Sequence, residues 1–474
     1  MKLSILPDIK IKSLQNDSRQ VGEGDVFLAY PGAVSDGRNF IQQAINAGAA
    51  AIVYEPAHFK IKPECPIPFV AYPNLAASLG DLARQFYGDS TRELYVVGVT
   101  GTNGKTTIAY QLAQAHQLLG ATAAYTGTLG SGRVDALKPL LNTTPDALHL
   151  QQLFHAYVKE HVQTVCMEVS SHALCMGRVD HVDFNQAIYT NLSHEHLDYH
   201  QTLEAYAAAK AKLFAFPELK VAIINQDDKF SEIMRSQVPS RCQILTYGLD
   251  NPCDVFGRNV RLDMRGSVLD VQTSSGHFEL CLKALGRFNV YNGLAVLTSL
   301  LAYGYALSDV LAIMPKLLPS PGRMEQVADS PVVLVDYAHT PDALRNALST
   351  LAELKQARLF VVFGCGGDRD PSKRALMGHV ANQYADCIIL TSDNPCTENP
   401  EAILDEIETG VGVGHHVLRI ENRRQAIERA LALAESDDII LIAGKGHESY
   451  QEIGRERFPF SDQEVVREVL SLQK

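Results

Sequence analysis

A glycine-rich segment of the chain, residues 95–107, carries residue types that can hold phosphate groups. An apolar run at 95–99 is typical of a buried strand, and it leads into Gly101, Thr102, Asn103, Gly104, Lys105, Thr106 and Thr107. Apolar residues then recur at the spacing of a helix, at Ile108, Leu112, Ala115 and Leu119. Glycines allow backbone N–H groups to approach phosphates, and the start of a helix attracts anions. The segment therefore predicts a phosphate-binding turn between a strand and a helix.

Two side chains of this turn indicate its chemistry. Lys105 can reach the β- and γ-phosphates of a nucleotide, and the Thr106 hydroxyl can ligate Mg²⁺. The pattern departs from a Walker A motif at one position, because Val99 stands where that motif has glycine. The order of strand, glycine turn, lysine and helix still favours a nucleotide site over a turn that binds nothing.

Candidate metal ligands follow two further apolar strands, predicted at 164–168 and 187–192. Glu168 ends the first strand, and the carboxyl end of a parallel strand faces the nucleotide crevice, where a carboxylate suits Mg²⁺. An acidic residue that merely terminates a strand is an equally good interpretation. The second strand leads into Ser193–His200, whose three histidines fit neither H-E-x-x-H nor a zinc finger. Among them, His196 is the best candidate for a second metal ligand.

The last third of the chain repeats a strand followed by a polar loop. Four such strands are predicted, at 332–335, 359–363, 387–391 and 439–443. In a doubly wound sheet, the loops that follow parallel strands meet at one edge, where ligands bind. Asp, Arg, His and Glu side chains in these loops therefore predict a second binding site rather than four ordinary turns.

The order of these elements predicts an α/β protein of three domains. Residues 1–88 form a small α/β domain, and residues 89–322 hold the phosphate-binding turn in a doubly wound, mostly parallel sheet. Residues 323–474 form a Rossmann-like domain. Within the central domain, residues 250–285 alternate as antiparallel strands do. A length of 474 residues suits about three domains.

Composition narrows the class of protein. A net charge of −12 argues against a general nucleic-acid binder. No apolar run approaches the ~18 residues of a membrane span, and the first residues lack the core of a signal peptide. Nine cysteines without a C-x-x-C pair are typical of free thiols in a reducing compartment. We therefore expect a cytoplasmic protein that binds neither nucleic acid nor a membrane.

With these motifs, the chain resembles the Mur ligases, the ATP-dependent amide-forming enzymes of peptidoglycan synthesis. The resemblance extends over essentially the whole chain. The segments that carry it are Asp17–Arg19, Gly24–Asp25, Asp36–Arg38, Gly101–Thr107, Asn142–Pro145, Glu168–Leu174, Asn191–His200, Gly286–Asn292, Pro321–Glu325, Asp336–Thr340, Gly364–Arg369, Asp393–Pro395 and Gly444–Glu448. It is greatest to members that add meso-2,6-diaminopimelate to UDP-N-acetylmuramoyl-L-alanyl-D-glutamate. The resemblance implies the same addition of meso-2,6-diaminopimelate through an acyl-phosphate intermediate, with ATP and Mg²⁺. We expect the protein to be a monomer.

The resemblance also implies roles for individual residues. The first domain would hold the UDP-sugar at Asn16, Ser18, Ala33, Val34 and Ser35. The muramoyl peptide would contact Asn142, Thr143, Thr144, Ser170, Met176 and Arg178. ATP would bind at Gly101, Thr102, Asn103, Gly104, Lys105, Thr106, Thr107, Asn289, Arg323, Asp336 and His339. The incoming amino acid would bind the third domain at Arg369, Asp393, Asn394, Pro395, Cys396, Gly444 and Glu448.

The catalytic residues implied by the resemblance are Lys105, Glu168, His196 and Lys210. The side chains of Thr106, Glu168 and His196 would help to bind Mg²⁺. Lys210 matches a carbamylated lysine of the family, whose added carboxylate ligates the metal. The spacing alone favours a different interpretation, a solvated lysine on a helix predicted at 203–214.

Two positions depart from the family pattern, both where substrates are expected. Members that add diaminopimelate have Arg after Asp-Asn-Pro, where it binds the distal carboxylate, and this chain has Cys396. Met176 stands in place of a glutamine and lacks its donor and acceptor. Either other contacts compensate, with Arg369 the first candidate, or the chain adds lysine or acts on a related substrate.

Two hypotheses that assign a different function can be tested against the same residues. A regulator that binds nucleotide without catalysis has no need of Lys105, Glu168 and Lys210, all of which are present. A folate-polyglutamylating enzyme shares the central fold. The first domain, which resembles a UDP-binding domain, and the Gly444–Glu448 loop both argue against a folate-polyglutamylating enzyme.

Overall fold

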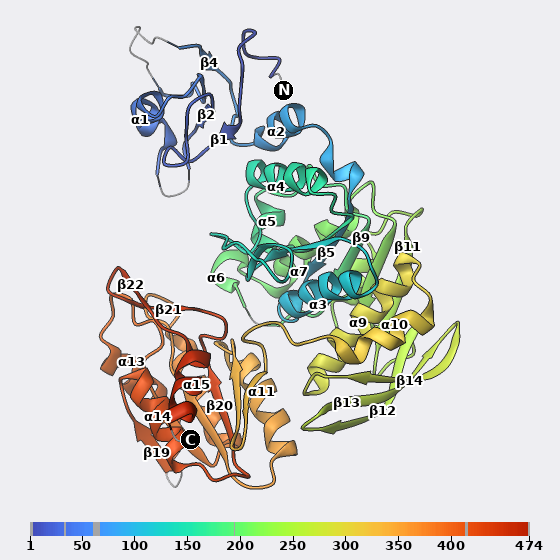
Figure 1. Ribbon diagram of the computed structural model, residues 1–474, viewed down its shortest axis with the longest axis vertical. Coiled ribbons are helices and arrows are strands. Elements are labelled where there is room, and N and C mark those ends of the chain that lie inside the picture. Colours follow the sequence, from blue (N-terminus) through green and yellow to red (C-terminus); the bar gives the residue numbers. More distant parts are fainter. Residues whose placement is uncertain (1–2, 33–34, 60–66, 194, 413–415, 473–474) are drawn as a thin grey trace.

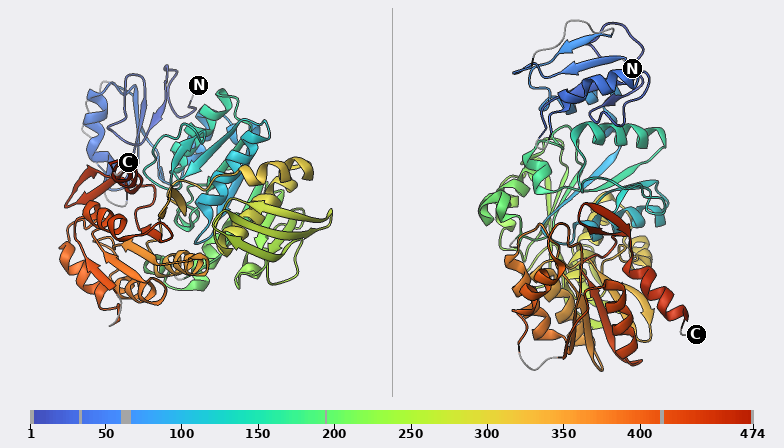
Figure 2. Two further views of the ribbon diagram at one scale, coloured as in Figure 1. Left: turned by 60° about the horizontal axis from the view of Figure 1, so that its bottom comes forward. Right: turned by 90° about the vertical axis from the view of Figure 1, so that its left-hand side faces the viewer.

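The computed structural model describes residues 3–32, 35–59, 67–193, 195–412 and 416–472. These residues form three α/β domains, each with its own sheet (Figure 1). The views of Figure 2 show the same division, with the small first domain at one end. The α/β fold of three domains predicted from the sequence is confirmed.

The first domain contains a four-stranded parallel sheet of order β1-β2-β3-β4. Its elements are β1 (Leu14–Gln15), β2 (Val26–Ala29), η1 (Gly37–Phe40), α1 (Ile41–Asn46), β3 (Ala51–Tyr54), β4 (Phe69–Ala71), α2 (Leu79–Tyr87) and η2 (Ser90–Glu93). Helix α1 buries Ile41 and Ala44 against one face of the sheet. Helix α2 buries Leu79 and Leu82 against the other face, so the sheet is covered on both sides.

The middle domain contains a ten-stranded sheet of order β14-β13-β12-β11-β10-β9-β5-β8-β6-β7. Its strands are β5 (Tyr95–Thr100), β6 (Ala123–Gly127), β7 (Gly130–Gly132), β8 (Thr164–Glu168), β9 (Gln186–Tyr189), β10 (Val221–Asn225), β11 (Gln243–Gly248), β12 (Val255–Asp263), β13 (Gly266–Thr273) and β14 (Gly276–Leu282). Pairing is parallel from β6 to β12 and antiparallel at both ends of the sheet. The antiparallel alternation predicted at 250–285 is confirmed.

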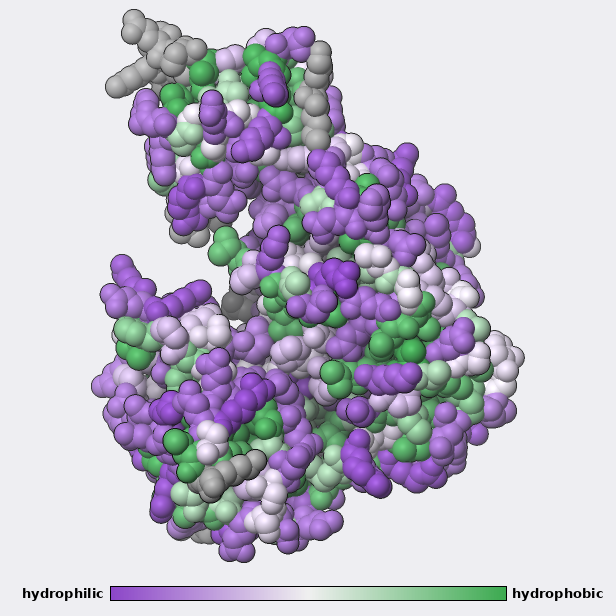
Figure 3. All heavy atoms as spheres, viewed as in Figure 1, coloured by the Kyte–Doolittle hydropathy of each residue, from purple (hydrophilic) through white to green (hydrophobic). Residues whose placement is uncertain are grey.

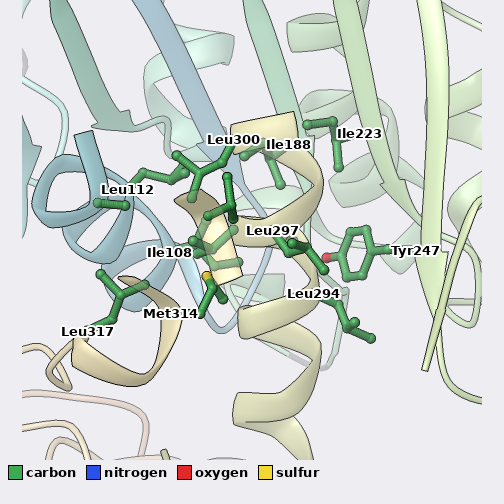
Figure 4. Close-up of a cluster of buried hydrophobic side chains, with 14 of the residues drawn as sticks. Ile108, Leu112, Ile188, Ile223, Tyr247, Leu294, Leu297, Leu300, Met314 and Leu317 are labelled. Atoms are coloured by element: carbon green, nitrogen blue, oxygen red, sulfur yellow. The ribbon is translucent and has the colours of Figure 1, made fainter. Parts of the chain in front are cut away.

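Helices cover both faces of this sheet. They are α3 (Lys105–Leu118), α4 (Ala147–Lys159), α5 (Ser171–Cys175), α6 (Leu197–His200), α7 (Leu203–Ala211), η3 (Lys212–Ala215), α8 (Ser231–Arg235), α9 (Arg287–Tyr303), α10 (Leu307–Ile313) and η4 (Met314–Lys316). Successive strand residues point to opposite faces, so Val97 packs with α3 and α9 while Val96 packs with α4 and α7. Figure 4 shows Ile108 of α3 near Leu297 of α9 in the middle of this cluster, with Leu112 and Leu294 toward its opposite sides. A strand buried on both faces is apolar throughout, which explains why the apolar runs identified these strands.

Helix α9 begins with a polar segment ahead of its apolar run at 294–302. It starts at Arg287, after Gly286 at φ +89°. Asn289 and Asn292 in its first turns face the glycine turn rather than the core. The first turns of this helix therefore serve a polar site.

The third domain contains a six-stranded sheet of order β15-β16-β20-β17-β18-β19, parallel except for β15. Its elements are β15 (Glu325–Asp329), β16 (Val332–Asp336), α11 (Pro341–Leu354), β17 (Leu359–Phe363), α12 (Ser372–Tyr384), β18 (Cys387–Leu390), α13 (Pro400–Glu408), β19 (His416–Arg419), α14 (Arg423–Leu433), β20 (Ile439–Ala443), the hairpin β21 (Tyr450–Ile453) and β22 (Glu456–Pro459), and α15 (Asp462–Leu472). Helices α11, α12 and α13 cover one face, and α14 and α15 cover the other. The four predicted strands are β16, β17, β18 and β20, neighbours in this sheet, so their loops emerge at one edge.

The surface is indented where the three domains meet. Figure 3 shows the first domain projecting above and the third domain below a recess that the middle domain closes. Within the described ranges, no helix has the length and apolar character needed to cross a membrane.

Candidate active site

The glycine turn lies at the carboxyl end of β5, between β8 and β9 in the middle of the sheet. Gly101 has φ +149° and Gly104 has φ +86°. A Cβ at Gly101 would lie 1.8 Å from Thr190 Oγ1, and one at Gly104 would lie 2.5 Å from Asn292 Oδ1. Both the backbone conformation and the close packing therefore require glycine.

The end of β9 holds the turn in place. Thr190 Oγ1 donates to Asn103 O at 2.6 Å, and Asn103 N donates to Asn191 Oδ1 at 3.0 Å. The backbone N–H of Thr102 donates to Asn191 O at 2.8 Å. Helix α3 starts directly after this turn, so the positive end of its dipole lies where a phosphate would bind. Asn191 was named only within a longer segment in the sequence, and its role appears only when β9 is placed beside β5.

Two lysines converge on one carbonyl of the turn. Lys105 Nζ donates to Gly101 O and Thr102 O, both at 2.8 Å, and Lys210 Nζ donates to Gly101 O at 2.8 Å. Lys210 is 1% exposed and lies over the Tyr206 ring at 4.3 Å, so the solvated lysine favoured by spacing is wrong. Burial, reinforced by the charge of Lys105, holds the pKa of Lys210 well below its ordinary value. The neutral form of such an amine is a nucleophile.

Glu168 ends β8 and is 1% exposed. Its Oε1 accepts hydrogen bonds from Tyr125 Oη at 2.5 Å and from the Thr128 N–H at 2.8 Å. Its Oε2 accepts one from Thr106 Oγ1 at 2.9 Å. Burial, together with the Glu168 charge, raises the pKa of Tyr125 well above its ordinary value, so this phenol remains a donor. Tyr125 was not identified from the sequence.

The Thr106 and Glu168 side chains fit a magnesium ion by their chemistry, because hydroxyl and carboxylate oxygens are the ligands that Mg²⁺ prefers. Their oxygens are 2.9 Å apart, as two ligands of one ion can be. In the described part of the chain, no group of three or more His, Cys, Asp or Glu side chains is arranged to hold a metal ion. These two oxygens alone therefore do not complete a magnesium site.

His196 lies in the segment that joins β9 to α6. Its Nε2 is 3.9 Å from Glu195 Oε2, and its ring is half-exposed. Glu195 also approaches the third domain, since its Oε1 is 4.0 Å from His339 Nε2. Burial lowers the pKa of both histidines, although Glu195 opposes the shift in each. Glu195 thus links the two domains beside the site, a role the sequence did not reveal.

A cavity of about 430 Å³ lies between the middle and third domains. Six of its lining residues were predicted to bind ATP, namely Asn103, Gly104, Thr107, Asn289, Arg323 and Asp336. Asn191 also lines the cavity. The Arg323 guanidinium lies over the Tyr337 ring at 4.6 Å, and its Nε has no hydrogen-bond partner among the described residues. Asp336 accepts a hydrogen bond from the Met324 N–H at 2.7 Å. His339 is not part of the lining and instead bonds the Tyr337 carbonyl at 2.8 Å.

The cavity wall also includes Asp227, which was not identified as a site residue from the sequence. Its carboxylate accepts hydrogen bonds from the N–H groups of Leu249 at 2.6 Å and Asn251 at 2.8 Å. It also accepts one from Tyr291 Oη at 2.9 Å. Burial opposes ionisation here, but these donors outweigh it and lower the pKa of Asp227. Asp227 therefore connects the turn after β10 to the loop after β11 and to α9.

We expect Asp227→Asn to lower the free energy of unfolding by about 2 kcal/mol at pH 7, because hydrogen bonds to a charged group contribute roughly 1.5–3 kcal/mol. The folded state has the lower pKa, so this stabilisation is present above the unfolded pKa of ~3.9 and is lost as pH falls through the folded value. Chemical denaturation between pH 7 and pH 3.5 measures it, with Asp309→Asn at an exposed position of α10 as the control. A difference in the free energy of unfolding between variant and parent that grows as pH falls would contradict this assignment.

A second cavity, of about 620 Å³, lies between the first and middle domains. Asn16, Ser18 and Ser35 line it, as the resemblance implies, together with Tyr30 and Gln43. Asn16 Nδ2 donates to Tyr30 Oη at 3.1 Å, and Ser18 Oγ donates to Gln43 Oε1 at 3.1 Å. Ala33 and Val34 lie outside the described residues.

The residues expected to contact the peptide gather near Glu168. Thr144 Oγ1 donates to Glu168 O at 2.9 Å, and Ser170 N donates to Thr144 Oγ1 at 3.0 Å. Arg178 Nη1 donates to Thr144 O at 3.0 Å, while its Nη2 lies 3.4 Å from Met176 Sδ. Thr143 Oγ1 lies 3.2 Å from Thr128 Oγ1, and Asn142 is exposed in the same turn.

The loops after β18 and β20 meet in the third domain. Asn394 Nδ2 donates to Glu448 Oε2 at 2.8 Å. Lys445, which is fully buried, donates to Asn394 Oδ1 at 2.9 Å and to Glu448 Oε2 at 3.0 Å. A Cβ at Gly444 would lie 2.2 Å from Asp393 Oδ2, so the two loops touch there as well. Lys445 was not singled out in the sequence, because its partner Asn394 lies on another strand.

Cys396 lies where an arginine was expected. Its φ is +50°, its N–H donates to Glu452 O at 3.2 Å, and its own carbonyl accepts from the Gly454 N–H at 2.7 Å. Burial raises the pKa of the Cys396 thiol, and the nearby Arg369 guanidinium opposes that shift. Arg369 is exposed in the loop after β17, close to Cys396, and Pro395 packs its carbonyl against Gly367 in the same loop.

Family models match most of the chain. They are described as "Mur ligase family, catalytic domain" over residues 10–87, "Mur ligase middle domain" over 99–300, and "Mur ligase, glutamate ligase domain" over 322–446. A protein of Chromobacterium violaceum is 44% identical, covering 99% of this chain and 98% of its own length. The chain belongs to the Mur ligase family. Its relative in Pseudomonas syringae pv. tomato is 45% identical, covering 98% of this chain and 96% of its own.

Both of these Mur ligase relatives are named UDP-N-acetylmuramoyl-L-alanyl-D-glutamate–2,6-diaminopimelate ligase. A solved structure of a ligase of that name has a TM-score of 0.70 at 39% identity, covering 98% of this chain and 95% of its own. A folylpolyglutamate synthase of Mycobacterium tuberculosis has a TM-score of 0.65 at 20% identity over 78% of this chain and 92% of its own. That last likeness concerns the fold alone.

Proposed function

We propose that this Mur ligase uses ATP to join meso-2,6-diaminopimelate to UDP-N-acetylmuramoyl-L-alanyl-D-glutamate, in peptidoglycan precursor synthesis. The observation that carries the proposal is the convergence of Lys105, Lys210 and Glu168 at a glycine turn beside an interdomain cavity. Two relatives named for these substrates are 44% and 45% identical to this chain over nearly its whole length, which supports this choice of substrates.

The three domains take separate substrates in this proposal. Residues 1–88 would bind the UDP-sugar, and the cavity lined by Asn16, Ser18 and Ser35 is large enough for one nucleotide. Residues 89–322 would bind ATP at the glycine turn. Residues 323–474 would bind the amino acid at Asp393, Asn394, Pro395, Cys396, Gly444 and Glu448, with Arg369 beside them.

Catalysis would proceed in two steps. A carboxylate oxygen of the UDP-bound dipeptide attacks the γ-phosphorus of ATP, and ADP leaves. The free amine of the amino acid then attacks the acyl carbon, and phosphate leaves with the carboxylate oxygen. Lys105 would neutralise charge on the phosphates, and the turn N–H groups would orient them, so positioning and electrostatics supply the catalysis.

The residues proposed to hold Mg²⁺ are Thr106, Glu168, His196 and Lys210 as its carbamate. When bound, the ion would offset the repulsion between the attacking carboxylate and the phosphates. The lowered pKa of Lys210 supports the carbamate, because CO₂ reacts with a neutral amine. Carbamylation would also turn a buried cation, costly beside Lys105, into an anion.

We expect Arg369→Ala to raise the KM for meso-diaminopimelate by about 10- to 100-fold, because an arginine–carboxylate bond contributes roughly 1.5–3 kcal/mol. Arg369 lies near Cys396 and would bind the distal carboxylate in place of the arginine that is missing at position 396. Steady-state kinetics would measure this, with Arg455→Ala in the exposed β21–β22 turn as the control. L-Lysine lacks that carboxylate, so any lysine activity should be unaffected, and equal losses on both amino acids would contradict the role.

A lysine-adding ligase is the second candidate, and Cys396 is the observation that favours it. A thiol cannot form the bidentate pair that a guanidinium makes with a carboxylate. If lysine is the substrate, Arg369→Ala should leave the KM for the preferred amino acid unchanged.

Isotope transfer tests the acyl-phosphate mechanism. The dipeptide substrate is labelled with ¹⁸O in its reacting carboxylate, and the released phosphate is analysed by mass spectrometry. We expect one ¹⁸O atom per phosphate, because the carboxylate oxygen leaves with the phosphoryl group. Phosphate without label would contradict the proposed order of steps.

A further inference from the structure

The first two residues of α15 hold a loop of the proposed amino-acid site, Gln463 directly and Asp462 through Arg423. Gln463 Nε2 donates to Gly446 O at 3.0 Å and to Glu325 Oε2 at 3.1 Å. Asp462 accepts two hydrogen bonds from Arg423, at 2.8 Å and 2.7 Å. Arg423 Nη2 in turn donates to Ala443 O at 3.0 Å, directly before Gly444. Two backbone carbonyls of residues 443–446 are thus fixed from α14 and α15.

This loop is in direct contact with the side chains expected to touch the amino acid. Lys445 binds both Asn394 and Glu448, as described above. Gly444 lies directly against the Asp393 carboxylate. Burial raises the pKa of Asp393, while the charges of Arg423 and Lys445 oppose that shift and so favour its anion. A displacement of the loop would therefore alter the positions of Asp393, Asn394 and Glu448 at once.

The chemistry of the Arg423–Asp462 pair suits positioning better than stability. Both side chains are 0% exposed, and Arg423 Nη1 has no hydrogen-bond partner among the described residues. Replacing a buried ion pair by apolar residues of similar volume is often neutral or stabilising. What apolar residues could not replace is the donor to the Ala443 carbonyl.

We propose that Arg423, Asp462 and Gln463 are positioning residues that fix the Gly444–Glu448 loop and thereby set the affinity for the incoming amino acid. This inference rests on the proposed function, because it takes that loop as part of the amino-acid site. None of the three residues touches the ATP cavity or the cavity of the first domain.

Two variants separate positioning from folding. The double variant Arg423→Met, Asp462→Leu removes both buried charges, and Gln463→Ala leaves the ion pair intact. We expect the KM for meso-diaminopimelate to rise about 10-fold or more in the first and about 3-fold in the second, since small displacements of positioning groups have large kinetic effects. The KM values for ATP and the UDP-dipeptide should stay within about twofold of the parent, and the Tm should show that both variants fold.

The control is another ion pair of the same sheet. Arg358 Nη2 lies 2.6 Å from the buried Asp438 carboxylate, at the opposite ends of β17 and β20 from the loops. Arg358→Met, Asp438→Leu should change the Tm without changing any KM.

Three outcomes would overturn the proposal. They are an unchanged KM for the amino acid in Gln463→Ala, an equal rise in all three KM values in the double variant, and the same selective rise in the control. If the double variant does not fold, Gln463→Ala alone decides. Failure of the proposed function is separate, since the unsubstituted protein would then release no phosphate in response to the amino acid.

Discussion

Replacing Lys105 by alanine should lower turnover by about 100- to 1,000-fold, the loss typical when one group that stabilises a transition-state charge is removed. Lys105 Nζ is held at 2.8 Å from two carbonyls of the glycine turn, so its charge lies at the start of α3, where the phosphates would bind. Turnover should be measured as ADP release at saturating amino acid, because the loss is expected in the chemical step as well as in ATP binding.

The matched control for Lys105 is Lys138→Ala, which removes an exposed lysine of the same domain. The Tm of Lys105→Ala should remain near that of the parent. Burial lowers the pKa of Lys105, so its charged form costs free energy in the folded state and its removal should not destabilise the fold. Turnover within about threefold of the parent would contradict the phosphate-binding role, because even a weak charge–charge contact of ~1 kcal/mol exceeds that factor.

Replacing Lys210 by alanine should also lower turnover by about 100-fold or more, because a ligand that secures the metal contributes several kcal/mol. The change removes the buried amine that donates to Gly101 O at 2.8 Å. Small carboxylates such as acetate or formate should restore part of the activity, since they can occupy the space of the carbamate. If Lys210 only donated a hydrogen bond to the turn, added carboxylates would not restore activity to Lys210→Ala.

Lys212→Ala is the matched control for Lys210, two residues further along and exposed. Mass spectrometry under native conditions in bicarbonate should detect an addition of CO₂ to the parent protein and not to Lys210→Ala. Near-normal turnover of Lys210→Ala would exclude the carbamate role, whatever the mass of the parent protein.

Local sequence patterns were sufficient for much of the fold. Strands β8, β17 and β20 were predicted with the bounds that the structure has, because strands buried on both faces are nearly continuous apolar runs. The first turns of α9 carry polar side chains toward the glycine turn, so the apolar run marks only the later part of that helix. Periodicity therefore detects cores and misses polar faces that are buried for other reasons.

The candidate site could be predicted only in part. Glu168 and Lys105 follow from a strand, a turn and a helix that are contiguous or parallel neighbours. The environment of Lys210 does not, because its burial depends on α7 packing against a turn 109 residues away. Lys445 and Arg423 were missed for the same reason, since each acts through partners on other strands or helices. Such contacts need the fold itself.

The most direct test of the central claim is phosphate release from ATP by the purified chain. UDP-N-acetylmuramoyl-L-alanyl-D-glutamate is supplied with meso-diaminopimelate, L-lysine or L-ornithine in separate reactions. We predict release only when ATP, the UDP-dipeptide and an amino acid are all present, with meso-diaminopimelate strongly preferred. Release that does not require the amino acid, or a preference for lysine or ornithine, would contradict the proposed activity.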